Sequence, residues 1–287
     1  MQIQPILPFG TRTFVMGIIN LTPDSFSGDG LMKKENVVEA ATRQAVQFVR
    51  EGADILDLGA ESTRPGAEPV DAQVELERLL PALQSITALH LNALISIDTY
   101  KATVAEECLK AGANMINDIW GLKKDAQLAQ VAASHAVPLV LMHNRSHNKF
   151  FQQSETLGGR YIGTTYQDLM NEICSDLQES IAIAHTAGVQ DQAIILDPGI
   201  GFGKTVEQNL SIIHHLQELR KLGYPILLGV SRKSFIGYTL DLPPEERLEG
   251  TAAAVALGIN NGADIIRVHD VKAMARVARM SDAIVRH

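Results

Sequence analysis

The sequence predicts a single-domain α/β protein with the architecture of a (β/α)8 TIM barrel, spanning residues 1–287. Eight short apolar segments alternate with amphipathic helical segments along the chain. The apolar segments are nearly continuous in Val, Ile and Leu, which is typical of parallel strands buried on both faces. No Pro/Gly/Ser-rich linker divides the chain. A doubly wound open sheet is the main alternative, but eight regular units without a linker favour the barrel.

The eight predicted strands cover residues 13–20, 53–60, 93–99, 114–119, 138–144, 193–199, 225–231 and 264–269. Helical patterns lie between them, and in residues 35–52 the apolar side chains recur on one face. Four of these helices end in a glycine that precedes the second, fourth, sixth and eighth strands. Glycine is favoured there because it adopts a left-handed backbone without a Cβ clash. These glycines are Gly52, Gly112, Gly188 and Gly262.

Residues 1–12 form an N-terminal extension or cap ahead of the first predicted strand. Long connections follow the first, second and fifth strands, at residues 21–36, 61–73 and 145–168. All three start at the carboxyl ends of strands, the face where barrel enzymes place their active sites. Residues 145–168 either cover the pocket or are a surface elaboration. We favour the elaboration and assign this segment no catalytic residue.

Composition excludes several classes of protein. The net charge of −8 argues against a broad nucleic-acid-binding face, although a local basic pocket for a small anion remains compatible with it. No apolar run reaches the ~18 residues that span a bilayer, and the N-terminus lacks the pattern of a signal peptide. The two cysteines are far apart and lie on apolar helical stripes, so neither a disulfide nor a zinc cluster is expected. These features favour a soluble, cytoplasmic protein.

Most predicted strands finish on a side chain suited to binding or catalysis. A lone aspartate at a strand end is usually a helix cap or a turn former. Seven or eight such residues converging on one rim favour a functional site instead. They are Asn20, Asp57, Asp98, Asn117, Met142, His143, Asp197, Ser231, Arg232, Lys233, Arg267 and His269.

The chemistry of this set divides in two. Asp98, Asn117 and Asp197 offer carboxylates and an amide, which suit a flat heterocycle with N–H donors. The second group is basic and suits a phosphate or pyrophosphate, because arginine offers paired donors and lysine a point charge. It consists of Arg64, Lys233, Arg267 and His269. The hypothesis is therefore a pocket for a nitrogen-rich ring that carries a phosphorylated arm.

The stretch "DPGIGFGKT" (197–205) superficially resembles a nucleotide-binding loop. A P-loop requires glycine at position 198, where this chain has Pro198. The evenly spaced glycines at 199, 201 and 203 do not fit the dinucleotide pattern either. The NTPase hypothesis is therefore disfavoured, and Lys204 is predicted to be a surface residue.

Metal-binding patterns are sparse. The pairs His143/His147 and His214/His215 are predicted to be structural or solvated, and no tetrahedral zinc set is visible. A magnesium ion carried in by a pyrophosphate needs only one or two protein oxygens, which Asn20 can supply.

Several segments resemble the dihydropteroate synthase family, in the family's order and across essentially the whole barrel. The most specific are "GIINLTPDSFSGDG" (17–30), "DLGAESTRPGA" (57–67), "ILDPGIGFGK" (195–204) and "LLGVSRKSFIG" (227–237). The resemblance implies a transferase of folate biosynthesis that joins 6-hydroxymethyl-7,8-dihydropterin diphosphate to 4-aminobenzoate, forming 7,8-dihydropteroate and pyrophosphate. It also implies Mg2+ as cofactor, a homodimer, the two small-molecule substrates as partners, and sensitivity to sulfonamides; neither nucleic acid nor a membrane is expected as a partner.

The resemblance assigns roles residue by residue. Pterin binding falls to Thr63, Asp98, Asn117, Met142, Asp197 and Lys233. Diphosphate binding falls to Asn20, which also matches the magnesium ligand, and to Arg267 and His269. Aminobenzoate binding falls to Thr63, Arg64, Pro65, Phe202 and Ser234. The catalytic residues are Asp98, Arg64 and Lys233.

The implied mechanism is loss of pyrophosphate to leave a pterin-stabilised cation, which the arylamine captures. Asp98 is expected to stabilise the positive charge as a carboxylate. Two alternatives stay open at this point. One is a pterin-binding methyltransferase that moves a methyl group from methyltetrahydrofolate to a corrinoid protein, and the other is a non-catalytic pterin-binding paralogue. Intact "ESTRPG" and "SRKSFIG" segments disfavour the first, and the intact residues 267–269 disfavour the second.

Overall fold

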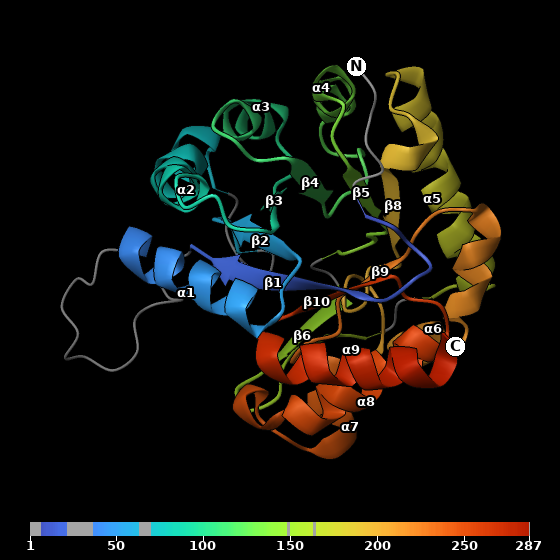
Figure 1. The fold of residues 1–287 in the computed structure, drawn as a ribbon. Coiled ribbons are helices and arrows are strands. Elements are labelled where there is room, and N and C mark those ends of the chain that lie inside the picture. Colours follow the sequence, from blue (N-terminus) through green and yellow to red (C-terminus); the bar gives the residue numbers. More distant parts are fainter. Residues whose placement is uncertain (1–6, 22–36, 63–69, 148–149, 163–164, 287) are drawn as a thin grey trace.

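Eight parallel strands form one sheet that curls into a barrel, with helices around its outside (Figure 1). The computed structural model describes residues 7–21, 37–62, 70–147, 150–162 and 165–286. In the order in which they pair, the strands are β8 (Ile194–Asp197), β5 (Leu139–Met142), β4 (Met115–Asp118), β3 (Leu94–Asp98), β2 (Ile55–Gly59), β1 (Phe14–Asn20), β10 (Ile265–Val268) and β9 (Leu227–Leu228). The predicted single-domain TIM barrel and its eight strands are confirmed.

The barrel closes between the two ends of this order, where β8 meets β9. Leu196 forms an isolated parallel bridge with Ile226, and its amide donates to the carbonyl of Pro225 at 2.9 Å. The pairing is short because β9 spans only two residues, fewer than the seven predicted for this strand.

The main helices are α1 (Val37–Glu51), α2 (Ala72–Thr87), α3 (Ala102–Lys110), α4 (Gln127–His135), α5 (Leu169–Thr186), α6 (Val206–His214), α7 (Ser234–Leu240), α8 (Leu248–Asn260) and α9 (Val271–Val285). The four glycines predicted to end helices all have the expected left-handed backbone, with φ between 92° and 108°. The pattern of helix ends read from the sequence is therefore confirmed.

The lower interior of the barrel is an apolar layer to which every strand contributes. It contains Phe14, Met16, Ile55, Met115, Val140, Ile195, Leu227 and Ile265, with Leu94 partly buried against it. Leu7 and Phe9, from the N-terminal extension, also pack against this layer. The layer fixes the barrel from inside and gives the polar residues above it a rigid floor.

The segment predicted to be a surface elaboration contains a two-stranded antiparallel hairpin, β6 (Phe151–Ser154) and β7 (Gly158–Tyr161). The hairpin packs on α7. The Tyr238 hydroxyl donates to the carbonyl of Gly158 at 3.1 Å, and Arg247 donates to the carbonyl of Leu157 at 3.0 Å. The contacts with α7 fit the surface role, but whether residues 145–168 also cover the pocket stays a prediction.

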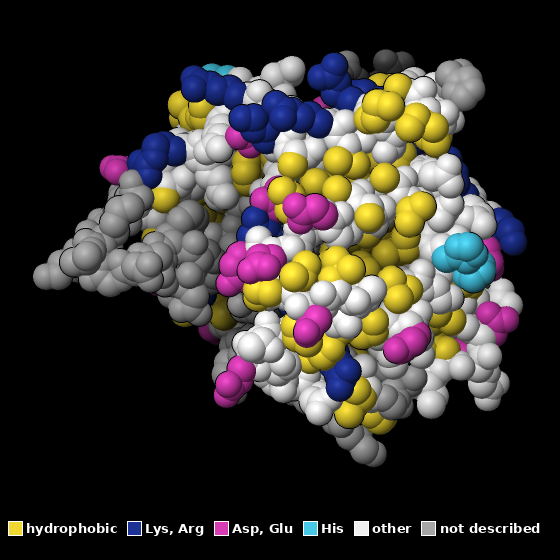
Figure 2. All heavy atoms as spheres, turned by 90° about the horizontal axis from the view of Figure 1, so that it is seen from below, with side chains coloured by type: hydrophobic (Ala, Val, Ile, Leu, Met, Phe, Trp, Pro, Cys, Tyr) yellow, Lys and Arg dark blue, Asp and Glu magenta, His cyan; other side chains and the backbone are white. Residues whose placement is uncertain are grey.

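The outer face of α6, α7 and α8 carries exposed apolar side chains. Leu257 on α8 is 59% exposed, and Leu240 on α7 and Leu210 on α6 are nearly as open. Figure 2 shows hydrophobic side chains gathered on the face that α7 and α8 present, with acidic side chains at its border. A groove of about 260 Å³ runs between these helices. Within the described ranges, no helix has the length and apolar character needed to cross a membrane.

Candidate active site

A polar layer lies directly above the apolar floor of the barrel. Side chains two residues apart on a strand point to the same face. Ile55 is therefore followed on the interior by Asp57, Met115 by Asn117, Ile195 by Asp197, and Ile265 by Arg267. The period of two thus places a layer of polar side chains at the carboxyl ends of strands that look apolar in sequence.

Arg267 links two acidic side chains across this layer. Its Nε donates to Oδ2 of Asp57 and its Nη2 donates to Oδ2 of Asp98, each at 2.6 Å. Asp57 is fully buried, and its Oδ2 also accepts from Nδ2 of Asn117 at 3.1 Å. One network therefore joins residues from four of the eight strands, β10, β2, β3 and β4.

Each aspartate keeps one oxygen for a further donor. Oδ1 of Asp57 and Oδ1 of Asp98 are buried and have no hydrogen-bond partner among the residues that the structure describes. A buried acceptor without a partner is costly, so such atoms indicate a site that a ligand completes. The two oxygens suit the N–H groups of a flat heterocycle.

Burial sets the charge state of this pair. It raises the pKa of Asp98 to about 7, although the positive charge of Arg267 opposes the rise. Burial also disfavours the charged form of Arg267, but Asp57 and Asp98 together raise its pKa above the usual value. Arg267 is therefore a permanent cation, whereas the charge of Asp98 changes near neutral pH.

Asp197 and Lys233 lie beside this network. Oδ1 of Asp197 accepts from the amide of Gly199 at 2.7 Å, and Nζ of Lys233 donates to the carbonyl of Ile200. The Lys233 ammonium also lies 4.8 Å from the centre of the Phe202 ring. Burial lowers the pKa of Lys233 to about 8, against the effect of Asp197, and burial raises the pKa of Asp197.

The remaining predicted residues lie around this network. Met142 is buried at the end of β5 and pairs in register with Asp197, while Asn20 ends β1 beside Gly59 of β2. The ring Nδ1 of His269 lies 3.0 Å from the hydroxyl of Ser231. Ser234 begins α7, directly after Lys233. The structure therefore brings Asn20, Asp98, Asn117, Met142, Asp197, Phe202, Lys233, Ser234, Arg267 and His269 to one end of the barrel. Thr63, Arg64 and Pro65 lie outside the described residues.

One prediction about this region is wrong. Lys204 is not a surface residue but is 1% exposed, with its ammonium inside the loop that joins β8 to α6. Sequence reasoning placed Asp57 in the polar set at the strand ends but gave it no specific role, although it accepts from both Arg267 and Asn117. Its signal was a carboxylate inside a strand that is otherwise apolar. His143, predicted to be structural, is buried and bonds Asp176.

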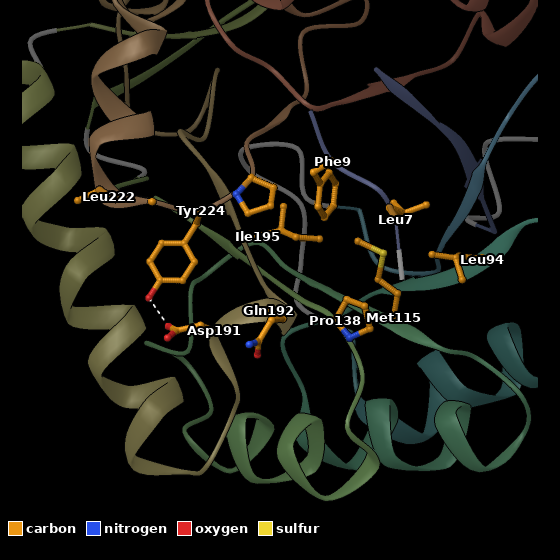
Figure 3. Close-up of a pocket in the computed structure, with 12 residues that line it drawn as sticks. Leu7, Phe9, Leu94, Met115, Pro138, Asp191, Gln192, Ile195, Leu222 and Tyr224 are labelled. Atoms are coloured by element: carbon orange, nitrogen blue, oxygen red, sulfur yellow. Dashed lines mark hydrogen bonds between the residues drawn. The ribbon is translucent and has the colours of Figure 1, made fainter. Parts of the chain in front are cut away.

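An apolar cavity lies at the other end of the barrel. It measures about 510 Å³ and is bounded by residues at the amino ends of the strands, including Leu94, Met115 and Ile195 (Figure 3). Leu7 and Phe9 of the N-terminal extension also point into it. Among the side chains that line the cavity, Figure 3 marks one hydrogen bond, from Tyr224 to Asp191 at 2.7 Å. The polar network, not this cavity, carries groups suited to catalysis.

Comparison with known proteins agrees with this geometry. The sequence model of a family described as pterin binding enzyme matches residues 16–269, from β1 to the residue after β10. The dihydropteroate synthase of Bacillus subtilis is 51% identical over 278 residues, which cover 97% of this chain and 90% of that relative. The chain therefore belongs to the dihydropteroate synthase family of pterin-binding enzymes.

Solved structures extend the similarity to the whole fold. A dihydropteroate synthase from Clostridium difficile, determined in the presence of pteroic acid, is 47% identical with a TM-score of 0.88, covering 98% of this chain and 100% of that one. The Xanthomonas albilineans dihydropteroate synthase with 4-aminobenzoic acid is 37% identical with a TM-score of 0.84, covering 96% and 94%.

Replacing Arg267 tests the network. Arg267→Met should lower the free energy of unfolding at pH 8 by about 3 kcal/mol or more, because two buried carboxylates lose their counter-ion. At pH 5 Asp98, with its pKa of about 7, is already protonated, so the loss should be smaller. Urea unfolding followed by circular dichroism measures both values.

The matched control is Arg232→Met. Arg232 also pairs with a carboxylate, that of Asp270. Because this ion pair is partly exposed, it should contribute at most about 1 kcal/mol to the free energy of unfolding. Equal losses for Arg267→Met at the two pH values would contradict the assignment of charge to Asp98.

Proposed function

We propose that this chain is a dihydropteroate synthase, which joins (7,8-dihydropterin-6-yl)methyl diphosphate to 4-aminobenzoate and releases diphosphate. The observation that carries the proposal is the Arg267 network at the carboxyl ends of the strands, where one oxygen of Asp57 and one of Asp98 have no partner among the described residues. The relatives found with pteroic acid and with 4-aminobenzoic acid support the same pair of substrates.

The pterin ring would bind across the barrel mouth. Asp98, Asn117 and Asp197 offer acceptors to its N–H edge, Lys233 offers a donor, and the thioether of Met142 lines the ring face. These groups stand on strands with a rigid apolar floor beneath them. The ring would therefore meet a preorganised set of hydrogen bonds rather than a mobile loop.

The diphosphate would lie at the rim, near Asn20, Arg267 and His269. Asn20 offers one amide oxygen, and no group of three His, Cys, Asp or Glu side chains in the described part of the chain could hold a metal ion. This donor set fits Mg2+ that arrives with the diphosphate, since Mg2+ keeps several waters and binds phosphate oxygens. Bound there by Asn20, Mg2+ would neutralise charge on the leaving group.

Asp98 would act on the opposite charge. When the C–O bond to the diphosphate breaks, the pterin methylene becomes positive, and an ionised carboxylate beside the ring stabilises it. Arg267 keeps Asp98 in place through Nη2 at 2.6 Å and offsets part of the cost of its ionisation in a buried site. No covalent nucleophile is required.

The second substrate would enter beside Phe202. The Phe202 ring offers an apolar face, with the Lys233 ammonium 4.8 Å from its centre and Ser234 following Lys233 at the start of α7. The arylamine nitrogen is a weak nucleophile, so water must be kept from the cation. Thr63, Arg64 and Pro65 are proposed to close the site, and catalytic roles for Arg64 and Lys233 remain part of the proposal.

Pyrophosphate release tests the function. The chain, Mg2+ and the dihydropterin diphosphate should release pyrophosphate with equimolar dihydropteroate when 4-aminobenzoate is present. An enzyme-coupled phosphate assay and chromatography of the product measure both. Pyrophosphate release that is independent of 4-aminobenzoate and yields no dihydropteroate would refute the proposal.

A homodimer through α6, α7 and α8 is also proposed. The groove between these helices is apolar, and Leu210, Leu240 and Leu257 are open to solvent in the single chain. Exposed apolar patches of this kind are typical of protein–protein contacts.

Leu257→Glu tests the dimer. Placing a charge at the centre of this face should shift the sedimentation coefficient of a dimer to that of a monomer at micromolar concentration. Met280→Glu, on the exposed side of α9, is the matched control and should leave the dimer intact. A wild-type protein that sediments as a monomer would exclude the proposed dimer.

A further inference from the structure

Lys204 is a buried cation to which the proposed mechanism assigns no role. Its Nζ lies 2.9 Å from the carbonyl oxygen of Gly199, 3.0 Å from that of Phe202 and 2.9 Å from Nδ1 of His143. The side chain therefore runs back under the loop of residues 199–203 and binds it from inside. Burying a lysine so completely is costly, which indicates that its three contacts do specific work.

The contacts match an ammonium with three donors. Burial lowers the pKa of His143 to about 3, so the ring is neutral. With its proton on Nε2, it donates to Asp176 at 3.0 Å and leaves Nδ1 to accept from Lys204. Burial also lowers the pKa of Lys204, but all three neighbours are acceptors, which favours the charged form. Asp176 is fixed in turn by Arg145, at 2.6 Å.

The loop has little freedom to adjust on its own. Gly199 and Gly203 have φ of 69° and 66°, and a Cβ at either position would lie 1.8 Å and 2.4 Å from the carbonyl oxygens of His143 and Arg145. The loop thus lies flat on the chain that follows β5. Asn209 holds it at a second point, accepting from the amide of Gly201 at 2.7 Å.

The loop carries groups of the active site. Gly199 bonds Asp197, Ile200 accepts from Lys233, and the Phe202 ring lies over the Lys233 ammonium. Asp197 is also fixed by its strand, since it pairs in register with Met142 of β5. Phe202 lies outside the strands. Its amide donates to the carbonyl of Gly199 at 3.1 Å and its carbonyl accepts from Lys204, so both of these bonds hold it through the loop that Lys204 binds.

We infer that Lys204 is a positioning residue for the second substrate: it holds the 199–203 loop so that Phe202 forms one wall of the 4-aminobenzoate site. The inference rests on the proposed function. It gives the lysine of "GFGK" a task in shaping a binding site, without contact to any phosphate. Because Asp197 is held by a barrel strand and Phe202 is held through this loop, loss of Lys204 affects the arylamine more than the pterin.

Lys204→Met tests the inference, because it keeps the apolar stem and removes the donors. The KM for 4-aminobenzoate should rise about tenfold, as loss of a buried hydrogen bond predicts, while the KM for the dihydropterin diphosphate changes less than threefold. Steady-state kinetics with each substrate varied gives both values. A rise of equal size in both KM values, or in neither, would overturn the inference.

Asp264→Asn is the matched control for a general loss of stability. Asp264 is buried at the amino end of the barrel, where it binds Arg220 and the amide of Ile226. This variant should lower the melting temperature and leave the ratio of the two KM values as in the wild type. If the wild type itself makes no dihydropteroate, the proposed function fails, and that result is distinct from failure of the inference.

A double-mutant cycle tests the route through Phe202. Phe202→Ala should raise the KM for 4-aminobenzoate. Adding Lys204→Met to this variant should change that KM little further, because both substitutions remove the same wall of the 4-aminobenzoate site. Fully additive effects would show that Lys204 does not act through Phe202. Should Lys204→Met fail to fold, Lys204→Gln carries the same test, since its shorter amide has two donors and cannot serve all three acceptors; an unchanged KM ratio would again overturn the inference.

Discussion

The active site depends on one guanidinium inside the barrel. Arg267 pairs with Asp57 and Asp98, and without it two carboxylates would stand uncompensated among buried strands. The desolvation of such groups costs several kcal/mol, which only close, well-directed partners offset. Because each partner comes from a different strand, the ion pairs also fix how β2, β3 and β10 present their carboxyl ends to a ligand.

This arrangement separates the two tasks of the barrel. The apolar layer below supplies stability, and the polar layer above supplies recognition, one strand period away. The network is incomplete as it stands, since one oxygen of Asp57 and one of Asp98 have no partner among the described residues. A site built in this way favours a ligand with several N–H donors. The loop of residues 199–203 lies beside it and is held by Asn209 and Lys204.

Strand positions and most of the site were predictable from sequence because both follow local rules. Buried parallel strands are apolar, and polar residues at their ends such as Asn117 and Asp197 stand out against that background. The resemblance of whole segments to one family then supplied the substrates. The roles of Thr63, Arg64 and Pro65 remain predictions, as do Mg2+ and the dimer.

What sequence reasoning missed depends on contacts between distant residues. Asp57 reads as one polar residue within a strand, and only the closed barrel brings it to Arg267, 210 positions away in the chain. Lys204 was expected at the surface because lysines are seldom buried. Its burial follows from the carbonyls of its own loop and from His143, 61 residues earlier. The hairpin of β6 and β7 carries no apolar run, so its short strands were not predicted.

The central claim is that the barrel interior sets the charge of Asp98, and that the ionised form acts in catalysis. An acid is ionised above its pKa, so kcat/KM should fall as the pH drops through about 7. Asp98→Asn should fold normally and lose about a hundredfold or more in turnover. Its remaining kcat/KM should not fall as the pH drops through about 7. The most direct measurement is the pH profile of kcat/KM for the two proteins. A limb near 7 that disappears in the variant is the predicted result; a wild-type limb near 4, or one near 7 that the variant retains, would contradict the account.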